Sequence, residues 1–206
     1  MKKKWLNEPE SYLLRNWSSA CLLEKSMATV REKYDEIFDK VLDAIQQEHP
    51  ELSRRVQQAT SSYGGSVGIA RQTWPDRSSA WPSGLWLDNI SLERLASEDE
   101  ERPSASVWIK PRRELWVDFK EAERRLSKAA AKVLSGQEAK LTSVKADRNE
   151  AYLWYPLPTP RQELLGLLQA DDPSGFIDCM VEHFEKLTRF TPVVDEIFAA
   201  GRSKRK

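Results

Sequence analysis

The segment from Ser26 to His49 contains the clearest helical pattern in the chain and constrains its fold most. Its apolar residues recur at steps of three, four and one, which is the period of an amphipathic helix. These residues are Met27, Val30, Tyr34, Ile37, Phe38, Val41, Leu42 and Ile45. Ser26 is a favourable cap for the start of this helix, and Pro50 disfavours helical backbone at His49. We therefore predict a helix that begins after Ser26 and ends near residue 48, preceded by another helix over residues 10–24.

The sequence period changes from 3.6 to 2 after this helix, which predicts a sheet. Residues 51–59 are predicted as a short helix that separates the two patterns. Segments with alternating apolar residues, or rich in β-branched and aromatic residues, then predict strands. The last two strands are predicted to form a hairpin with a turn at residues 147–150. The predicted strands cover residues 63–70, 85–92, 105–110, 140–146 and 151–157.

Residues 111–119 allow two interpretations. In the first, Pro111 occupies the first helical position and a helix begins there. In the second, residues 114–117 form a strand and the helix begins at Asp118, with Glu121 completing a capping box. We prefer the second, because Trp and Val favour strands. In both, the helix runs to about Leu134 and stops at Gly136, since glycine commonly follows a helix C-terminus.

Three residue pairs with proline in second place predict the starts of the C-terminal helices. Proline is favoured in the first turn of a helix, and Thr or Asp before it can cap the free N–H groups. The pairs are Thr159-Pro160, Asp172-Pro173 and Thr191-Pro192. The last helix is predicted to end at Gly201, and residues 201–206 are predicted to form a basic, disordered tail.

These elements together predict an α+β fold. Its sheet is expected to be mainly antiparallel, with about five strands packed against N-terminal, central and C-terminal helices. We predict a core domain over residues 1–158, with helices within 10–48, strands within 63–117, a helix at 118–135 and a hairpin at 140–157. Residues 159–200 are predicted to pack on the same domain, with a separate helical subdomain as the alternative.

Charge and cysteine content narrow the function classes. The 206 residues include 32 Lys and Arg and 32 Asp and Glu, so the formal net charge is zero. Zero net charge argues against a chain-wide electrostatic attraction to nucleic acid or to a membrane surface. Cys21 and Cys179 lack a zinc-ligand spacing, so we predict free thiols, no metal site and no cofactor. No apolar run approaches the roughly 18 residues of a membrane span, and we predict a cytoplasmic protein.

A loop over residues 72–84 is the first candidate binding site. It contains Trp74-Pro75 and Trp81-Pro82, with Arg77 between them. Trp and Arg are enriched among the residues that dominate protein interfaces, so we predict that Trp74, Trp81 and Arg77 bind a partner. The alternative is that both indole rings fold back onto the sheet, as large aromatic side chains usually do.

A second candidate surface alternates aromatic rings with cations. Trp108, Lys110, Arg112, Arg113 and Trp116 follow each other closely on a predicted hairpin. Such a surface can stack bases and contact phosphates, so Trp108, Arg112 and Arg113 are candidate nucleic-acid-binding residues. The alternative is an ordinary strand whose Trp side faces the core while its Lys and Arg face water.

A third candidate is catalytic. Asp76 follows a proline, and Asp118 and Lys120 form an acid-x-Lys triplet; Asp88 is an alternative first acid. With the order helix, three strands, helix, strand, these residues resemble the core of the PD-(D/E)XK nuclease superfamily. The resemblance implies that the two acids hold Mg²⁺ and that Lys120 assists attack of water on phosphate. The chain departs from the family pattern, since 42 positions separate Asp76 from Asp118 and the strand at 107–110 carries no acid.

The functional prediction follows from these candidates and from the motifs that the chain lacks. It contains no nucleophile elbow, P-loop, dinucleotide fingerprint or zinc-protease motif. We predict a non-catalytic, protein-binding accessory or regulatory subunit of an intracellular complex, with a protein partner or a second copy bound. The alternative is a divergent nuclease, or a nucleic-acid-binding protein, and Mg²⁺ is expected only with the nuclease.

Overall fold

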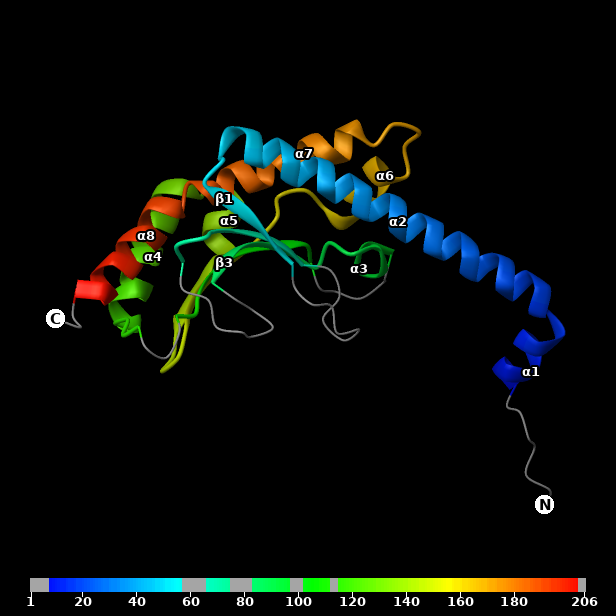
Figure 1. The fold of residues 1–206 in the computed structure, drawn as a ribbon, viewed down its shortest axis with the longest axis horizontal. Coiled ribbons are helices and arrows are strands. Elements are labelled where there is room, and N and C mark those ends of the chain that lie inside the picture. Colours follow the sequence, from blue (N-terminus) through cyan, green and yellow to red (C-terminus); the bar gives the residue numbers. More distant parts are fainter. Residues whose placement is uncertain (1–7, 57–65, 75–82, 97–101, 112–114, 204–206) are drawn as a thin grey trace, which may run out of the picture. The chain divides into compact units, whose positions relative to one another are not determined.

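The computed structural model describes residues 8–56, 66–74, 83–96, 102–111 and 115–203 (Figure 1). The chain forms two compact units, unit 1 over residues 1–37 and unit 2 over residues 38–206. The boundary between the two units falls inside a helix. Residues 201–203 of the predicted disordered tail belong instead to helix α8, Thr191–Ser203, and residues 204–206 lie outside the described residues.

Helix α1, Glu8–Arg15, and the first part of helix α2, Trp17–Glu48, form the described part of unit 1. The helix break lies at Asn16, whose side-chain amide donates to the carbonyl oxygen of Tyr12 over 2.9 Å. The predicted helix start at Ser26 is wrong. The Ser26 hydroxyl donates to the Leu22 carbonyl oxygen four residues earlier, so it is satisfied inside a continuous helix.

Unit 2 is built on an antiparallel sheet. Its six described strands are β1 (Leu52–Val56), β2 (Val67–Arg71), β3 (Gly84–Asp88), β4 (Ser104–Ile109), β5 (Ser143–Ala146) and β6 (Ala151–Pro156). They lie in the order β1-β2-β3-β4-β6-β5, and every neighbouring pair is antiparallel. The predicted α+β fold with a mainly antiparallel sheet is therefore confirmed, with one more strand than expected.

The additional strand is β1, where a short helix over 51–59 was predicted. Residues 52–56 pair along their whole length with β2, from Leu52 opposite Arg71 to Val56 opposite Val67. The Leu52 side chain is buried. Pairing with a distant segment therefore outweighs the weak local pattern.

Two boundaries in the sheet region also differ from expectation. Strand β3 ends at Asp88 because Asn89 has a φ of 59°, a left-handed conformation that asparagine tolerates. Helix α3, Leu92–Ala96, then replaces the end of the predicted strand over 85–92. The predicted strand at 114–117 does not form over its described residues 115–117.

Helix α4, Phe119–Val133, begins at the cap predicted for it. The carboxylate of Asp118 accepts a hydrogen bond from the backbone N–H of Glu121 over 3.1 Å. Helix α4 ends with Leu134 as its C-cap, close to the predicted end, and Gly136, with a φ of 57°, opens helix α5, Gly136–Leu141. The hairpin of β5 and β6 closes as expected, with the N–H of Asp147 donating to the carbonyl oxygen of Glu150.

The C-terminal helices begin next to the predicted proline pairs. They are α6 (Arg161–Leu168), α7 (Ser174–Thr188) and α8 (Thr191–Ser203). Helix α8 continues past Gly201, where the predicted end was placed. The approach of α8 to the Trp116 carbonyl explains the glycine, because a Cβ there would lie 2.5 Å from that oxygen.

One face of the sheet carries the core of unit 2. On it, Leu85 of β3 lies opposite Val107 of β4, which lies opposite Leu153 of β6, and all three side chains are fully buried. Helix α7 packs against β3 and β4, and α4 packs against β5 and β6. Tyr155 on the same face contacts Phe190, between α7 and α8. Figure 1 shows α8 side by side with α4. Helices α4 and α7 therefore cover this face of the sheet, and α8 packs against α4.

On the other face, the ring of Trp86 lies against Gly68. These residues are opposite each other on β3 and β2, and Trp86 is fully buried. A Cβ at position 68 would lie 2.5 Å from the indole ring. Gly68→Ala is therefore expected to lower the free energy of unfolding by about 1–3 kcal/mol, because the ring must move out of its packed position. Urea denaturation measures this loss.

Gly166 provides a matched control for Gly68. It lies inside α6, is exposed, and has no atom within 4 Å of the position that a Cβ would take. Gly166→Ala is expected to raise the free energy of unfolding by up to about 1 kcal/mol, since alanine is the better helix former. Equal stability of Gly68→Ala and the wild type would show that Trp86 relaxes without cost.

Candidate functional site

Trp74, predicted to bind a partner, instead packs inside unit 2. It is 3% exposed, and its indole N–H donates to a carboxylate oxygen of Asp195 over 2.7 Å. Its ring centroid lies 6.4 Å from that of Phe198. A buried and hydrogen-bonded ring is not available to a partner. Trp81 and Arg77, the other predicted binding residues of this loop, lie outside the described residues.

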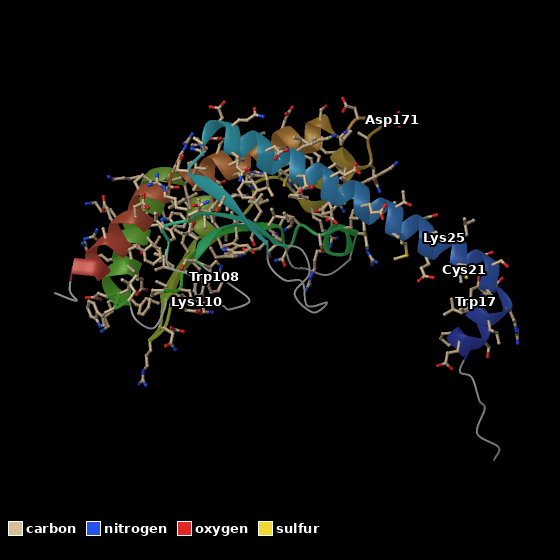
Figure 2. All side chains as sticks on the ribbon, viewed as in Figure 1. Trp17, Cys21, Lys25, Trp108, Lys110 and Asp171 are labelled. Carbon is tan, nitrogen blue, oxygen red and sulfur yellow. The ribbon has the colours of Figure 1, made fainter. Side chains whose placement is uncertain are left out.

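Trp108 is held by contacts within the sheet. Its ring stacks on Tyr152 with centroids 4.9 Å apart, and its indole N–H donates to the Ser106 hydroxyl. The Lys110 ammonium lies 5.8 Å from the Trp108 ring centroid and 2.7 Å from a carboxylate oxygen of Glu150 (Figure 2). This cation is therefore already neutralised by a neighbouring acid. Arg112 and Arg113 lie outside the described residues, so the predicted nucleic-acid surface stays a prediction.

The acids of the nuclease hypothesis occupy different surroundings. Burial raises the pKa of the Asp88 carboxyl, although hydrogen bonds from Ser106 and Ser66 act in the opposite direction. Asp118 is the cap of α4 and lines a cavity beside α8. Lys120 is exposed on α4, and Asp76 lies outside the described residues. Within the described part of the chain, no three His, Cys, Asp or Glu side chains form a group that could hold a metal ion.

A cysteine and a histidine meet on α7, a pair that the sequence analysis did not single out. The Sγ of Cys179 lies 3.6 Å from Nε2 of His183, which is 3.1 Å from the Thr159 hydroxyl. Burial raises the pKa of the Cys179 thiol and lowers that of His183 to about 4. A nucleophilic thiolate–imidazolium pair requires the opposite shifts, so this cluster is a neutral packing contact. The four-residue spacing of Cys179 and His183 on a predicted helix could have indicated this contact.

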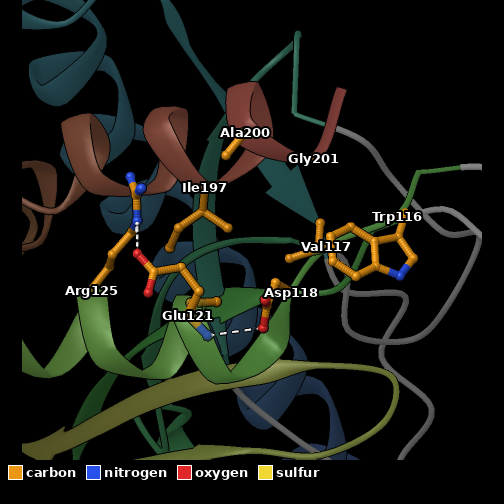
Figure 3. Close-up of a pocket in the computed structure, with 9 residues that line it drawn as sticks. Trp116, Val117, Asp118, Glu121, Arg125, Ile197, Ala200 and Gly201 are labelled. Carbon is orange, nitrogen blue, oxygen red and sulfur yellow. Dashed lines mark hydrogen bonds and ion pairs between the residues drawn. The ribbon is translucent and has the colours of Figure 1, made fainter. Parts of the chain in front are cut away.

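A cavity of about 190 Å³ lies between the start of α4 and the end of α8 (Figure 3). Val117, Ile197 and Ala200 contribute apolar walls, and Trp116 is half-exposed at its edge. Of the charged groups in its lining, Arg125 binds Glu121 and also Glu196 of α8, and Asp118 accepts the capping hydrogen bond of α4. The cavity is smaller than the roughly 300 Å³ at which typical small-molecule sites begin. It therefore accommodates at most a small apolar group.

The surface of unit 1 is the most unusual feature of the described chain. Eight large apolar side chains there are 47–68% exposed. They are Tyr12, Leu13, Leu14, Trp17, Leu22, Leu23, Met27 and Val30. No described residue of unit 1 is buried, whereas Phe38, Val41, Leu42 and Ile45 in the unit 2 part of α2 are. The sequence pattern predicts helices over these residues, but none of them was among the predicted binding residues.

Figure 2 shows the uncovered side chains of this helix, with Trp17, Cys21 and Lys25 labelled on successive turns. Scattered single apolar residues on a surface are ordinary, but eight large ones exposed within residues 12–30 of α1 and α2 point to an interaction site. We therefore take the exposed apolar residues of unit 1 as the candidate functional site.

Comparison with protein-family models, with curated proteins and with solved structures finds no match to this chain. Among the described helices, none combines the length and the apolar character that crossing a membrane requires.

Proposed function

We propose that this protein is a non-catalytic, protein-binding subunit that binds its partner through unit 1. The observation that carries the proposal is the set of eight large apolar side chains that are about half-exposed or more on α1 and the first part of α2. Burying one such side chain completely stabilises a complex by about 1.5–3 kcal/mol, before the entropic cost of association. Covering this surface therefore provides a strong driving force for binding.

The charges of unit 1 favour a protein partner over a membrane surface. Unit 1 as a whole contains seven basic and six acidic residues, and its described helical part, residues 8–37, contains four basic and six acidic ones. A helix that lies on a membrane typically has a polar face rich in Lys and Arg, which attracts anionic lipids. The helical part, which has more acidic than basic residues, lacks this attraction. The proposed location is the cytoplasm.

The nuclease and nucleic-acid-binding alternatives stay predictions. Asp76, Arg112 and Arg113, on which they depend, lie outside the described residues. Mg²⁺ would be a cofactor only if the nuclease alternative holds.

Site-specific photocrosslinking in cells tests the proposed function. A photoreactive amino acid at Leu23, which is 62% exposed in unit 1, is expected to give an adduct with another polypeptide. Leu141 is the matched control, because it is also an exposed leucine, at 49%, but lies on α5 of unit 2. The expected yield at Leu23 is several-fold higher than at Leu141. Equal yields, or adducts with lipid alone at Leu23, would contradict the proposal.

A further inference from the structure

Inside unit 1, α2 carries an apolar seam with the spacing of a coiled coil. Its six residues follow each other at alternating steps of three and four. The apolar seam consists of Ala20, Leu23, Met27, Val30, Tyr34 and Ile37. In heptad notation, Ala20, Met27 and Tyr34 occupy a positions and the other three occupy d positions. Leu23, Met27 and Val30 are 62%, 47% and 51% exposed. A seam of this kind packs against a second helix.

Glu24 and Arg31 flank the seam at e positions. They lie seven residues apart, or roughly 10 Å along the helix, which separates them beyond contact within one chain. In an antiparallel pair of helices, e positions face e positions of the other helix. Glu24 then meets the second copy's Arg31, and Arg31 meets the second copy's Glu24. In a parallel pair, e positions lie beside g positions of the other helix. Glu24 and Arg31 would then lie beside Ser19 and Ser26, and neither ion pair would form.

The seam is also complementary to itself in size when two copies run antiparallel. The register that aligns these charges places Ala20 opposite Ile37, Leu23 opposite Tyr34 and Met27 opposite Val30. In the first two of these pairs, a smaller side chain, Ala20 or Leu23, faces a larger one, Ile37 or Tyr34. Such matching keeps the two helices at a nearly constant separation, which close packing requires.

We propose that the apolar seam binds a second copy of this chain in an antiparallel, two-fold symmetric coiled coil. This inference rests on the proposed function of unit 1 and specifies its partner. A two-fold interface uses the same surface on both copies, and the paired Glu24 and Arg31 provide the self-complementarity that it needs. The outward-facing f positions Lys25 and Glu32 are charged and stay in water. The zero net charge of the chain does not oppose self-association.

Two opposite charge reversals in the full-length protein test the orientation and the partner together. Glu24→Arg leaves only positive e positions, and Arg31→Glu leaves only negative ones, so each variant repels itself. Sedimentation velocity is expected to show a dimer for the wild type and at least a tenfold weaker dimer for each variant. An equimolar mixture of the two variants is expected to recover wild-type affinity, because each arginine again faces a glutamate. Glu32→Arg, at an f position, is the control and is expected to dimerise like the wild type.

Circular dichroism of each variant verifies that the helices are retained. A wild type that is monomeric at all concentrations would overturn the inference. So would variants that dimerise normally, or a mixture that fails to recover. Photocrosslinks from Leu23 to a different protein, together with a monomeric wild type, would leave the proposed function standing and remove only the self-association. Equal crosslinking at Leu23 and Leu141 would instead remove the proposed function.

Discussion

Lys186→Met is expected to lower the free energy of unfolding by about 3–5 kcal/mol, because it leaves a buried carboxylate unpaired. The Lys186 ammonium donates to Glu138 over 2.7 Å, and the Glu138 side chain is only 7% exposed. This ion pair connects α5 with α7 above the sheet. Urea denaturation at neutral pH measures the loss.

The double variant Glu138→Met/Lys186→Met separates the cost of an unpaired charge from the contribution of the ion pair. Replacing both partners removes the uncompensated charge, so most of the lost stability is expected to return. Arg124→Met is the matched control at an exposed ion pair, where Glu121 is the acid, and its effect on the melting temperature is expected to be small. A Lys186→Met protein as stable as the wild type would show that Glu138 is hydrated or protonated once Lys186 is gone.

The parts of the fold that could be predicted are those with strong local signals. Asp118 caps α4 as expected, and the helices after Pro160, Pro173 and Pro192 begin within a residue or two of the predicted positions. Local chemistry determines these boundaries, because the free N–H groups of a first turn need a nearby acceptor or a proline. The hairpin of β5 and β6 is also predictable from local signals, because a turn sequence at residues 147–150 joins two segments that favour strands.

The parts that could not be predicted depend on distant contacts. Strand β1 exists because it pairs with β2, and nothing in residues 52–56 alone indicates that partner. The burial of Trp74 depends on Asp195 and Phe198, which follow it by more than a hundred residues. An aromatic residue beside a proline is compatible with both an interface and a core, and only the tertiary structure distinguishes them.

The candidate site was partly predictable. The amphipathic period of residues 27–45 establishes an apolar side for α2, but that period is the same in both units. Only the structure shows that Phe38 and Val41 are covered while Met27 and Val30 are exposed. Burial is a property of the surroundings, so a single sequence indicates an apolar face without indicating what covers it.

The second large effect is expected on acidification, and it arises from His183. Burial lowers the pKa of this imidazole from 6.5 to about 4, and the side chain is 4% exposed. In the unfolded chain the imidazole takes up a proton below about pH 6.5, whereas the folded protein keeps it neutral until about pH 4. Stability contributed by neutral His183 is therefore complete above pH 6.5 and is lost as the pH falls toward 4.

His183→Gln isolates this contribution, because glutamine does not titrate. Each pKa unit of difference corresponds to about 1.4 kcal/mol, so the wild type is expected to lose roughly 3 kcal/mol more than the variant between pH 7 and pH 4. Asp88 acts in the opposite direction, since its raised pKa lets the folded state bind a proton first, but it does so in both proteins. Urea denaturation at several pH values measures the difference, and NMR titration of the His183 ring measures its pKa directly. A titration midpoint near 6.5 would show that the imidazole is hydrated, and the difference between the two proteins would then vanish.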